Sequence, residues 1–374
     1  MFNEHEIVEL LGELVRRESP SRDKAALDVL GTLLAERLID LGASVETVPN
    51  AVGGDHVLGR FSRNSDLRPA LVLGHFDTVW PRGTLERLPF RVDEEGRAFG
   101  PGVFDMKASL AIFLAVIKQI RKSWELLPRP IWVLLTSDEE IGSPTSRGLI
   151  EKLASQCAYA LVLEPALADG GLKTSRKGVG RFRLDVEGKA AHAGVAPQDG
   201  RSAIVGIARQ ILKLETLQDL AAGTTINVGV IEGGTTPNVV PALASAEIDV
   251  RVASQAEESR IVSAFRSLAS DMEGIRLTIT GSFNRPPMER TPAVSALFEQ
   301  ALEVGRRLNL ELTEGSSGGG SDGNFTAAMG VPTLDGLGAR GGGAHADDEH
   351  VIVASLPERA ELLFGLLRFL HTET

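Results

Sequence analysis

The chain of 374 residues is 43% hydrophobic, which is enough to build a large core and more than one domain. Its 39 Lys and Arg against 50 Asp and Glu give a net charge of −11, which argues against nucleic acid or an anionic membrane as the main partner. Cys157 is the single cysteine, so an intrachain disulfide is excluded and a reducing compartment is expected. The acidic N-terminus lacks a signal-like apolar core, and the apolar run at 110–117 is too short to span a bilayer, so we expect a soluble cytoplasmic protein.

Helices and strands are predicted to alternate through the first half of the chain. Apolar residues recur at helical spacing over 7–15, 26–41 and 106–122, and Gly42 is placed to cap the second helix. Short apolar strands are predicted at 45–48, 56–61, 71–73, 131–135 and 158–163. Strands that alternate with helices in this way indicate an α/β domain with a mainly parallel sheet.

The pattern changes from about Lys177 onward. Apolar and polar residues alternate over 182–186, as in a strand with one solvated face. The predicted elements that follow are a helix at 202–214, strands at 225–231 and 244–252, a helix at 257–272 and a strand at 275–280. This β-α-β-β-α-β order is typical of a small ferredoxin-like α+β domain with its helices on one face. We therefore expect residues 177–286 to form a domain inserted into an α/β domain, which is built from residues 1–176 and 287–374.

A histidine and an aspartate follow the strand predicted at 71–73. His75 and Asp77 are two residues apart, so in an extended chain their side chains point to the same side. An imidazole and a carboxylate at this spacing can form a metal ligand and the group that orients it. A histidine with a purely structural role is the commoner explanation of such a pair taken alone.

Further potential ligands follow other predicted strands or lie in Gly-rich loops. They are Asp105, Glu139, Glu140, Glu164 and His345. In open α/β sheets, ligands collect at the carboxyl ends of the strands, so we expect these side chains to meet at one edge of the sheet. Two histidines with several carboxylates suit a pair of divalent metal ions, with zinc favoured and manganese or cobalt as possible substitutes. Any one of these carboxylates is more often a solvated loop residue.

The run from Asp138 to Glu140 has two interpretations. It can be a solvated acidic turn. Alternatively, three adjacent carboxylates between two strongly apolar strands repel one another, which favours a bound cation or a raised pKa for one of them.

The glycine-rich stretch 318–323 matches the G-x-G-x-x-G pattern of dinucleotide-binding proteins, and a strand is predicted before it at 308–313. The next predicted strand begins near Val331, which is too soon for the βαβ unit that this fingerprint requires. We therefore interpret the stretch as a flexible loop or as one that another part of the chain approaches closely.

Taken in order, these motifs resemble the M20 family of metallopeptidases, and most closely its glutamate carboxypeptidase (carboxypeptidase G2-like) branch. The resemblance extends from His75 to His345 and covers nearly the whole chain. It is carried by Gly-His-Phe-Asp-Thr-Val at 74–79, Pro-Phe-Arg-Val at 89–92, Gly-Pro-Gly at 100–102, Asp-Glu-Glu-x-Gly-Ser at 138–143, Glu-Pro at 164–165 and Gly-Gly-Gly-Ser-Asp at 318–322.

The resemblance implies a catalytic domain that binds two zinc ions per chain. His75 and Glu164 would bind one zinc, Glu140 and His345 would bind the other, and Asp105 would bridge them. Asp77 would orient His75, and Glu139 would be the general base that deprotonates a water between the metals.

The resemblance also assigns roles to the inserted domain, which would act as a dimerisation and lid domain in a homodimer. His192 would stabilise the tetrahedral oxyanion in the active site of the partner subunit, and Asn238 would join it there. Arg285 would pair with the terminal carboxylate of the substrate. Arg176 is a further candidate contact, because its Arg-Lys-Gly context departs from that of close relatives and is found in amino-acid deacetylases of the same family. Without the resemblance, His192 is an ordinary loop histidine.

The expected function is a dizinc amide or peptide hydrolase that releases a C-terminal amino acid, with glutamate as one candidate, from an N-acyl or peptidyl substrate. The alternatives are an N-acyl-amino-acid deacetylase similar to acetylornithine deacetylase, and a non-catalytic binding protein with the same fold. The expected partners are a small substrate and a second copy of the chain, with neither nucleic acid nor membrane.

Overall fold

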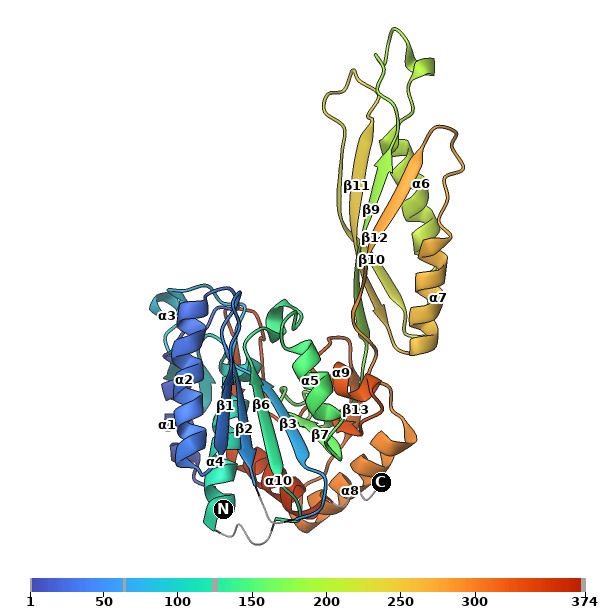
Figure 1. Ribbon diagram of the computed structural model, residues 1–374. Coiled ribbons are helices and arrows are strands. Elements are labelled where there is room, and N and C mark those ends of the chain that lie inside the picture. The colour runs from blue at the N-terminus through green and yellow to red at the C-terminus, as the bar shows by residue number, and fades with distance from the viewer. Residues whose placement is uncertain (1, 63–64, 123–126, 371–374) are drawn as a thin grey trace. The chain divides into compact units, whose positions relative to one another are not determined.

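The computed structural model describes residues 2–62, 65–122 and 127–370, and its contacts divide the chain into two compact units (Figure 1). Unit 1 comprises Met1–Thr174, Arg290–Ser316 and Ser321–Thr374, and unit 2 comprises Ser175–Glu289 and Ser317–Gly320. The protein is thus an α/β chain into which a smaller α+β unit is inserted. The boundaries at 177 and 286 stay a prediction.

Unit 1 is built around a six-stranded sheet in the order β1-β2-β6-β3-β7-β14. The four strands from β6 to β14 run parallel, whereas β1 and β2 form an antiparallel edge. The sheet is therefore mainly parallel, as predicted. Its strands are β1 (Ser44–Val48), β2 (His56–Phe61), β3 (Ala70–His75), β6 (Ile131–Thr136), β7 (Tyr159–Val162) and β14 (Thr333–Leu334).

Both faces of this sheet are covered, because side chains on a strand alternate between its two sides. Val72 of β3 belongs to one apolar core, whereas Leu71 and Leu73 belong to the other. In Figure 1 α1 and α2 lie on the opposite side of the sheet from α5 and α9. The first core packs against α1 (Glu4–Val15), α2 (Lys24–Asp40), α4 (Ala108–Ile120), α8 (Pro292–Arg307) and α10 (Leu356–Phe369), and the second against α5 (Arg147–Ala154) and α9 (Gly323–Ala328).

A second, smaller sheet in unit 1 brings two loops together. Its order is β15-β16-β5-β4, from β15 (Gly341–Gly342), β16 (His350–Ile352), β5 (Arg97–Phe99) and β4 (Arg91–Val92). The pairing of β16 with β5 sets the loop at 343–349 beside the loop that begins at Gly100. His345 lies in the first of these loops and Asp105 follows the second.

Unit 2 is an antiparallel sheet of order β10-β11-β9-β12 with α6 and α7 packed on one face. Burial alternates along β9, with Phe182, Leu184 and Val186 in the core, as the sequence pattern predicts. The elements are β9 (Gly178–Glu187), α6 (Ala203–Glu215), β10 (Thr225–Gly233), β11 (Leu243–Val252), α7 (Gln255–Arg266) and β12 (Arg276–Arg285). Their order is the predicted ferredoxin-like one.

Two sequence-based assignments differ from the structure. The helix predicted to reach Met272 ends at Arg266. The apolar residues at 308, 310 and 312 pack against the main core without forming a strand, and β13 (Glu314–Ser317) follows them and pairs with β8 (Leu172–Arg176). Within the described residues, every helix is too short or too polar to cross a membrane.

Candidate metal centre

Three adjacent parallel strands of unit 1 place four of the predicted site residues at one edge of the sheet. His75 is the last residue of β3, and Glu139 and Glu140 begin a short helical turn after β6. Glu164 follows the end of β7 by two residues. Because β6, β3 and β7 are neighbours and run in the same direction, their carboxyl ends open at the same edge. The expected gathering of these side chains is therefore a direct consequence of strand order.

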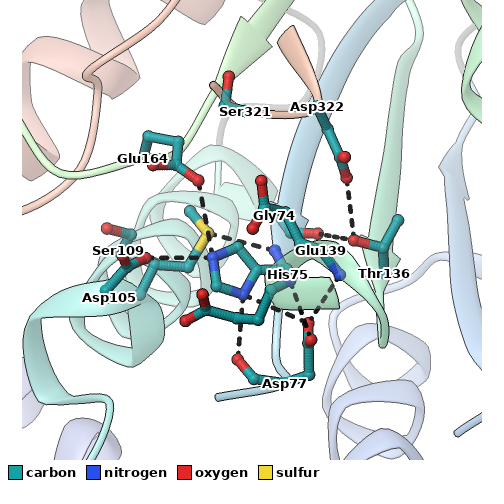
Figure 2. Close-up of polar contacts among 12 residues, drawn as sticks. Gly74, His75, Asp77, Asp105, Ser109, Thr136, Glu139, Glu164, Ser321 and Asp322 are labelled. Atoms are coloured by element: carbon teal, nitrogen blue, oxygen red, sulfur yellow. Dashed lines mark hydrogen bonds and ion pairs between the residues drawn. The ribbon is translucent and has the colours of Figure 1, made fainter. Parts of the chain in front are cut away.

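The two ring nitrogens of His75 face different partners (Figure 2). Nδ1 lies 3.0 Å from the main-chain oxygen of Asp77 and 3.4 Å from its Oδ1. Nε2 lies 3.1 Å from Oδ1 of Asp105 and 3.6 Å from Oε1 of Glu164. Asp77 therefore fixes the orientation of the ring with its carbonyl as well as its carboxylate, and Nε2 points into the group of carboxylates.

The carboxylate of Asp77 has a second set of contacts. It is fully buried and accepts hydrogen bonds from the backbone N–H groups of Glu139, at 3.1 Å, and Glu140, at 3.2 Å. One buried carboxylate thus links the loop after β3 to the turn after β6. By accepting from these two N–H groups, the carboxylate of Asp77 fixes the backbone positions from which the side chains of Glu139 and Glu140 extend.

The three acidic residues at 138–140 have two different roles. Asp138 is buried and accepts hydrogen bonds from the backbone N–H and hydroxyl groups of both Thr145 and Ser146, so it stabilises the turn. Glu139 and Glu140 belong instead to the group of ligand atoms around His75. The run is therefore not a solvated acidic turn, because its first carboxylate is satisfied inside the protein.

Asp105 lies between the two predicted histidine ligands. Its Oδ1 is 3.1 Å from Nε2 of His75, and its Oδ2 is 3.5 Å from Nε2 of His345. The same nitrogen of His345 lies 3.2 Å from Oε1 of Glu140. His345 has a φ of +64°, a left-handed conformation that non-glycine residues seldom adopt, within the loop between β15 and β16.

The donor set suits a divalent metal. Ligand atoms of His75, Asp105 and Glu140 all lie within 4.8 Å of one another, and so do those of His75, Glu139 and Glu164. Imidazole nitrogens mixed with carboxylate oxygens are typical ligands of zinc and of similar divalent ions. Glu139 falls inside the second group, so its position is compatible with a ligand as well as with a base.

The protonation of these groups reflects an excess of buried negative charge. Burial lowers the pKa of His75, but its contacts with Asp105 and Asp77 leave that pKa well above the usual value. Asp105 and Glu140 raise the pKa of His345 to about 10, and burial raises the pKa of Glu140 to about 6. The pKa of Asp105 is lowered, because its contacts with both histidines outweigh its burial. A divalent cation would supply the same compensating charge in place of these protons.

One buried carboxylate of this region is absent from the sequence-based prediction. Glu349 is 3% exposed and accepts hydrogen bonds from Trp80 and from backbone N–H groups that include that of Asp105. In the sequence it ends the run Asp-Asp-Glu in a polar loop, which is typical of solvated residues. No local signal distinguishes it, apart from its place four residues after His345.

The remaining predicted site residues lie in unit 2. Nδ1 of His192 accepts hydrogen bonds from the N–H groups of Gly194 and Val195, both at 3.2 Å, which leaves Nε2 to carry the ring proton. The backbone oxygen of Asn238 accepts a hydrogen bond from Ala193 at 2.9 Å, so the loops that carry His192 and Asn238 are joined.

Two arginines of unit 2 lie against the glycine-rich loop. Arg176 donates to the carbonyl of Gly319 at 3.1 Å and is 3% exposed. Arg285 is 5% exposed, and a Cβ added at Gly320 would lie 2.5 Å from its Cδ. The loop is therefore one that another part of the chain approaches closely, and a side chain at position 320 would force Arg285 to move.

The chain is similar to known proteins over most of its length. Residues 71–368 match the peptidase family M20/M25/M40. The chain is 30% identical over 373 residues to carboxypeptidase G2 of a Pseudomonas species, covering 96% of this chain and 88% of that protein. It is 29% identical over 380 residues to succinyl-diaminopimelate desuccinylase of Halorhodospira halophila, covering 97% and 98%.

A solved structure shares the fold over almost the whole length. The aminopeptidase PepT of Bacillus cereus superimposes with a TM-score of 0.84 at 23% identity and covers 98% of both chains. The match over residues 71–368 extends through every residue of the candidate metal centre. The chain belongs to the peptidase family M20/M25/M40 and is a hydrolase that acts on amide bonds.

Proposed function

We propose that this protein is a two-metal amide hydrolase that releases a C-terminal amino acid from N-acyl or peptidyl substrates. The observation that carries the proposal is the position of Asp105. Its two carboxylate oxygens face different histidines, with Oδ1 3.1 Å from His75 and Oδ2 3.5 Å from His345. A carboxylate that offers one oxygen to each of two imidazole-containing sites is what a bridging ligand requires.

In the proposed assignment His75 and Glu164 hold one zinc ion, Glu140 and His345 hold the other, and Asp105 bridges them. Manganese or cobalt would suit the same donors. When bound, the two ions would polarise the scissile carbonyl and lower the pKa of the attacking water. His75 and Glu164 are buried, whereas the side chain of His345 is 48% exposed, so the second proposed metal position lies nearer to solvent.

Glu139 is the proposed general base. Its carboxylate takes a proton from the attacking water and later delivers it to the leaving amine. The backbone N–H of Glu139 donates to Asp77 at 3.1 Å, and this hydrogen bond holds the backbone from which the Glu139 side chain extends. His192 is the proposed donor to the oxyanion through Nε2–H, delivered with Asn238 from the partner subunit of a homodimer.

The substrate class follows from the basic residues of unit 2. A guanidinium pairs with a carboxylate through two parallel hydrogen bonds, which makes Arg285 the proposed partner of the terminal carboxylate of the substrate, with Arg176 as a second candidate contact. The relative named carboxypeptidase G2 favours release of a C-terminal amino acid, and the resemblance to the glutamate carboxypeptidase branch makes glutamate the first candidate. The relative named succinyl-diaminopimelate desuccinylase, together with Arg-Lys-Gly at 176–178, favours the second candidate, an N-acyl-amino-acid deacylase.

Metal analysis and a substrate panel test the proposal together. Protein purified with zinc is expected to hold about two metal ions per chain, to lose activity on chelation and to regain it when zinc is returned. The panel contains N-acyl-glutamates, folate-like conjugates, acetylornithine and dipeptides. Release of glutamate at the highest kcat/KM supports the carboxypeptidase, and preference for acetylornithine supports the deacylase. Full activity without metal, or one metal per chain at full activity, would contradict the two-metal assignment.

Arg285→Gln is expected to raise KM by at least about tenfold for substrates with a free α-carboxylate, because a charge-assisted bidentate pair is lost. The same substrates with the α-carboxylate converted to an amide should show no such change between the two proteins. Arg276→Gln is a matched control, since Arg276 lies on the same strand, pairs with Glu187 and is 72% exposed. An equal rise in KM for both forms of the substrate would remove the assignment of Arg285.

A further inference from the structure

Glu349 is a buried carboxylate whose two oxygens are both occupied by N–H donors. Oε2 accepts from Nε1 of Trp80 at 2.7 Å and from the backbone of Gly102 at 3.0 Å. Oε1 accepts from the backbone of Phe104 at 2.9 Å and of Asp105 at 3.0 Å. Charge-assisted hydrogen bonds of this length are stronger than neutral ones, and burial of the group makes them more so.

These contacts join three segments that each border the candidate metal centre. Trp80 follows Asp77 by three residues, and the backbone from Gly102 leads directly to Asp105. Glu349 belongs to the loop that carries His345, and its own N–H donates to the carbonyl of Ala346 at 2.9 Å. One side chain therefore ties the loop of the proposed bridging ligand to the loop of a proposed terminal ligand.

The contacts of Glu349 parallel those of Asp77. The carboxylate of Asp77 accepts from the N–H groups of Glu139 and Glu140, and so fixes the turn that carries them. Glu349 does the same for Asp105, and neither carboxylate is among the grouped ligand atoms. Outer groups that hold metal ligands in place typically change metal affinity by about 10–100-fold when they are removed.

We propose that Glu349 is a positioning residue that sets Asp105 and His345 at the spacing required for two metals, before either metal binds. This inference rests on the proposed function. It requires that the loops be held in the metal-free protein by the N–H contacts of Glu349 itself. It also requires that Trp80, as a side-chain donor to that carboxylate, contribute through the same contact.

The Glu349→Gln variant removes the acceptor with almost no change of shape. One end of the amide keeps an oxygen and the other becomes an NH2 group, which cannot accept. Because each carboxylate oxygen of Glu349 faces two N–H donors, either orientation of the amide sets the NH2 group against two donors. At least two buried N–H groups then lose their partner.

The test measures zinc affinity in the full chain by competition with a chromophoric chelator, and amide exchange over residues 100–107 in the metal-free protein. Glu349→Gln is expected to bind zinc at least about tenfold more weakly and to exchange these amides faster. Trp80→Phe, which removes one donor and keeps the carboxylate, is expected to weaken zinc binding less. In the double variant the fold loss of zinc affinity should be smaller than the product of the two single fold losses. The reason is that the Trp80 N–H, one of the donors that the new amide leaves without an acceptor, is no longer present.

Leu38→Ala is the control for stability. Leu38 is fully buried in α2, is distant in sequence from every candidate ligand, and packs beside Gly59 of β2. This substitution should lower Tm and leave zinc affinity unchanged. Should Glu349→Gln fail to fold, Trp80→Phe alone carries the test. If Glu349→Gln binds zinc as tightly as the unaltered protein, the inference is overturned, and the two-metal function still stands. If Glu349→Gln does not fold, unchanged zinc affinity in Trp80→Phe has the same consequence. Absence of metal dependence in the unaltered protein would instead overturn the function.

Discussion

In the proposed two-metal centre, Glu139→Gln is expected to keep both zinc ions and to lose about 10²–10⁴-fold in kcat. The amide has the size of the carboxylate but cannot take a proton from water at neutral pH. The backbone N–H of Glu139 would still donate to Asp77 at its position in the turn, so the proposed ligand Glu140 keeps its place. Metal content by elemental analysis and kcat on the preferred substrate are the two measurements.

This variant separates the two roles that the geometry allows Glu139. Ligand atoms of Glu139, His75 and Glu164 lie within 4.8 Å of one another, so Glu139 could hold a metal rather than act as the base. A ligand replaced by an amide would lose zinc together with activity, whereas a base would lose activity alone. Glu36→Gln, on the exposed side of α2, is the matched control and should change neither quantity. Near-normal kcat in Glu139→Gln would remove Glu139 as the base.

Asp105→Asn is expected to weaken the binding of both zinc ions by more than about 100-fold, beyond the range that outer contacts reach. The carboxylate has an oxygen toward each histidine, and the amide keeps only one oxygen and no charge. Loss of the shared anion raises the repulsion between two cations bound to the remaining ligands. Activity should therefore fall to the background level at zinc concentrations that saturate the unaltered protein.

The control for this prediction is another Asp→Asn change in the same region. Asp347 lies two residues from His345, is 67% exposed and pairs with Arg87 rather than with a candidate ligand. Asp347→Asn should keep both zinc ions and most of the activity. The bridging role would be wrong if Asp105→Asn lost a single zinc ion and bound the second with unchanged affinity.

Most of the fold could be predicted because it rests on local periodicity. The apolar strands around Val72 and Val133 are bounded by turn residues, and the alternation from Phe182 to Val186 matches a sheet with one buried face. The ends of the helices and strands were harder to predict. Residues 308–312 have an apolar alternation typical of a strand, but they pack without strand pairing, because pairing depends on what lies beside them.

The candidate ligands could be found for a related reason. His75 and Glu140 stand at or just after strand ends, and parallel neighbouring strands bring such positions to one edge. The acidic run shows where this reasoning stops. Asp138 and Glu139 are adjacent and chemically alike, yet the first stabilises its own turn and the second faces the ligand atoms. The direction of each side chain follows from the backbone of the turn and is not encoded in residue type.

The sequence alone determined the class of chain, the strands and helices, and the residue types that gather for chemistry, because these depend on spacing and composition. Only the tertiary structure decided which groups hold the others in place. Arg176 donates to the glycine-rich loop, and Glu349 accepts from Trp80 and from the backbone that leads to Asp105. All three contacts join residues more than 100 positions apart in the chain, with separations of 143, 269 and 244 residues. A hydrogen bond to a distant backbone group leaves no pattern in the sequence, since every residue carries a carbonyl acceptor and every residue except proline an N–H donor.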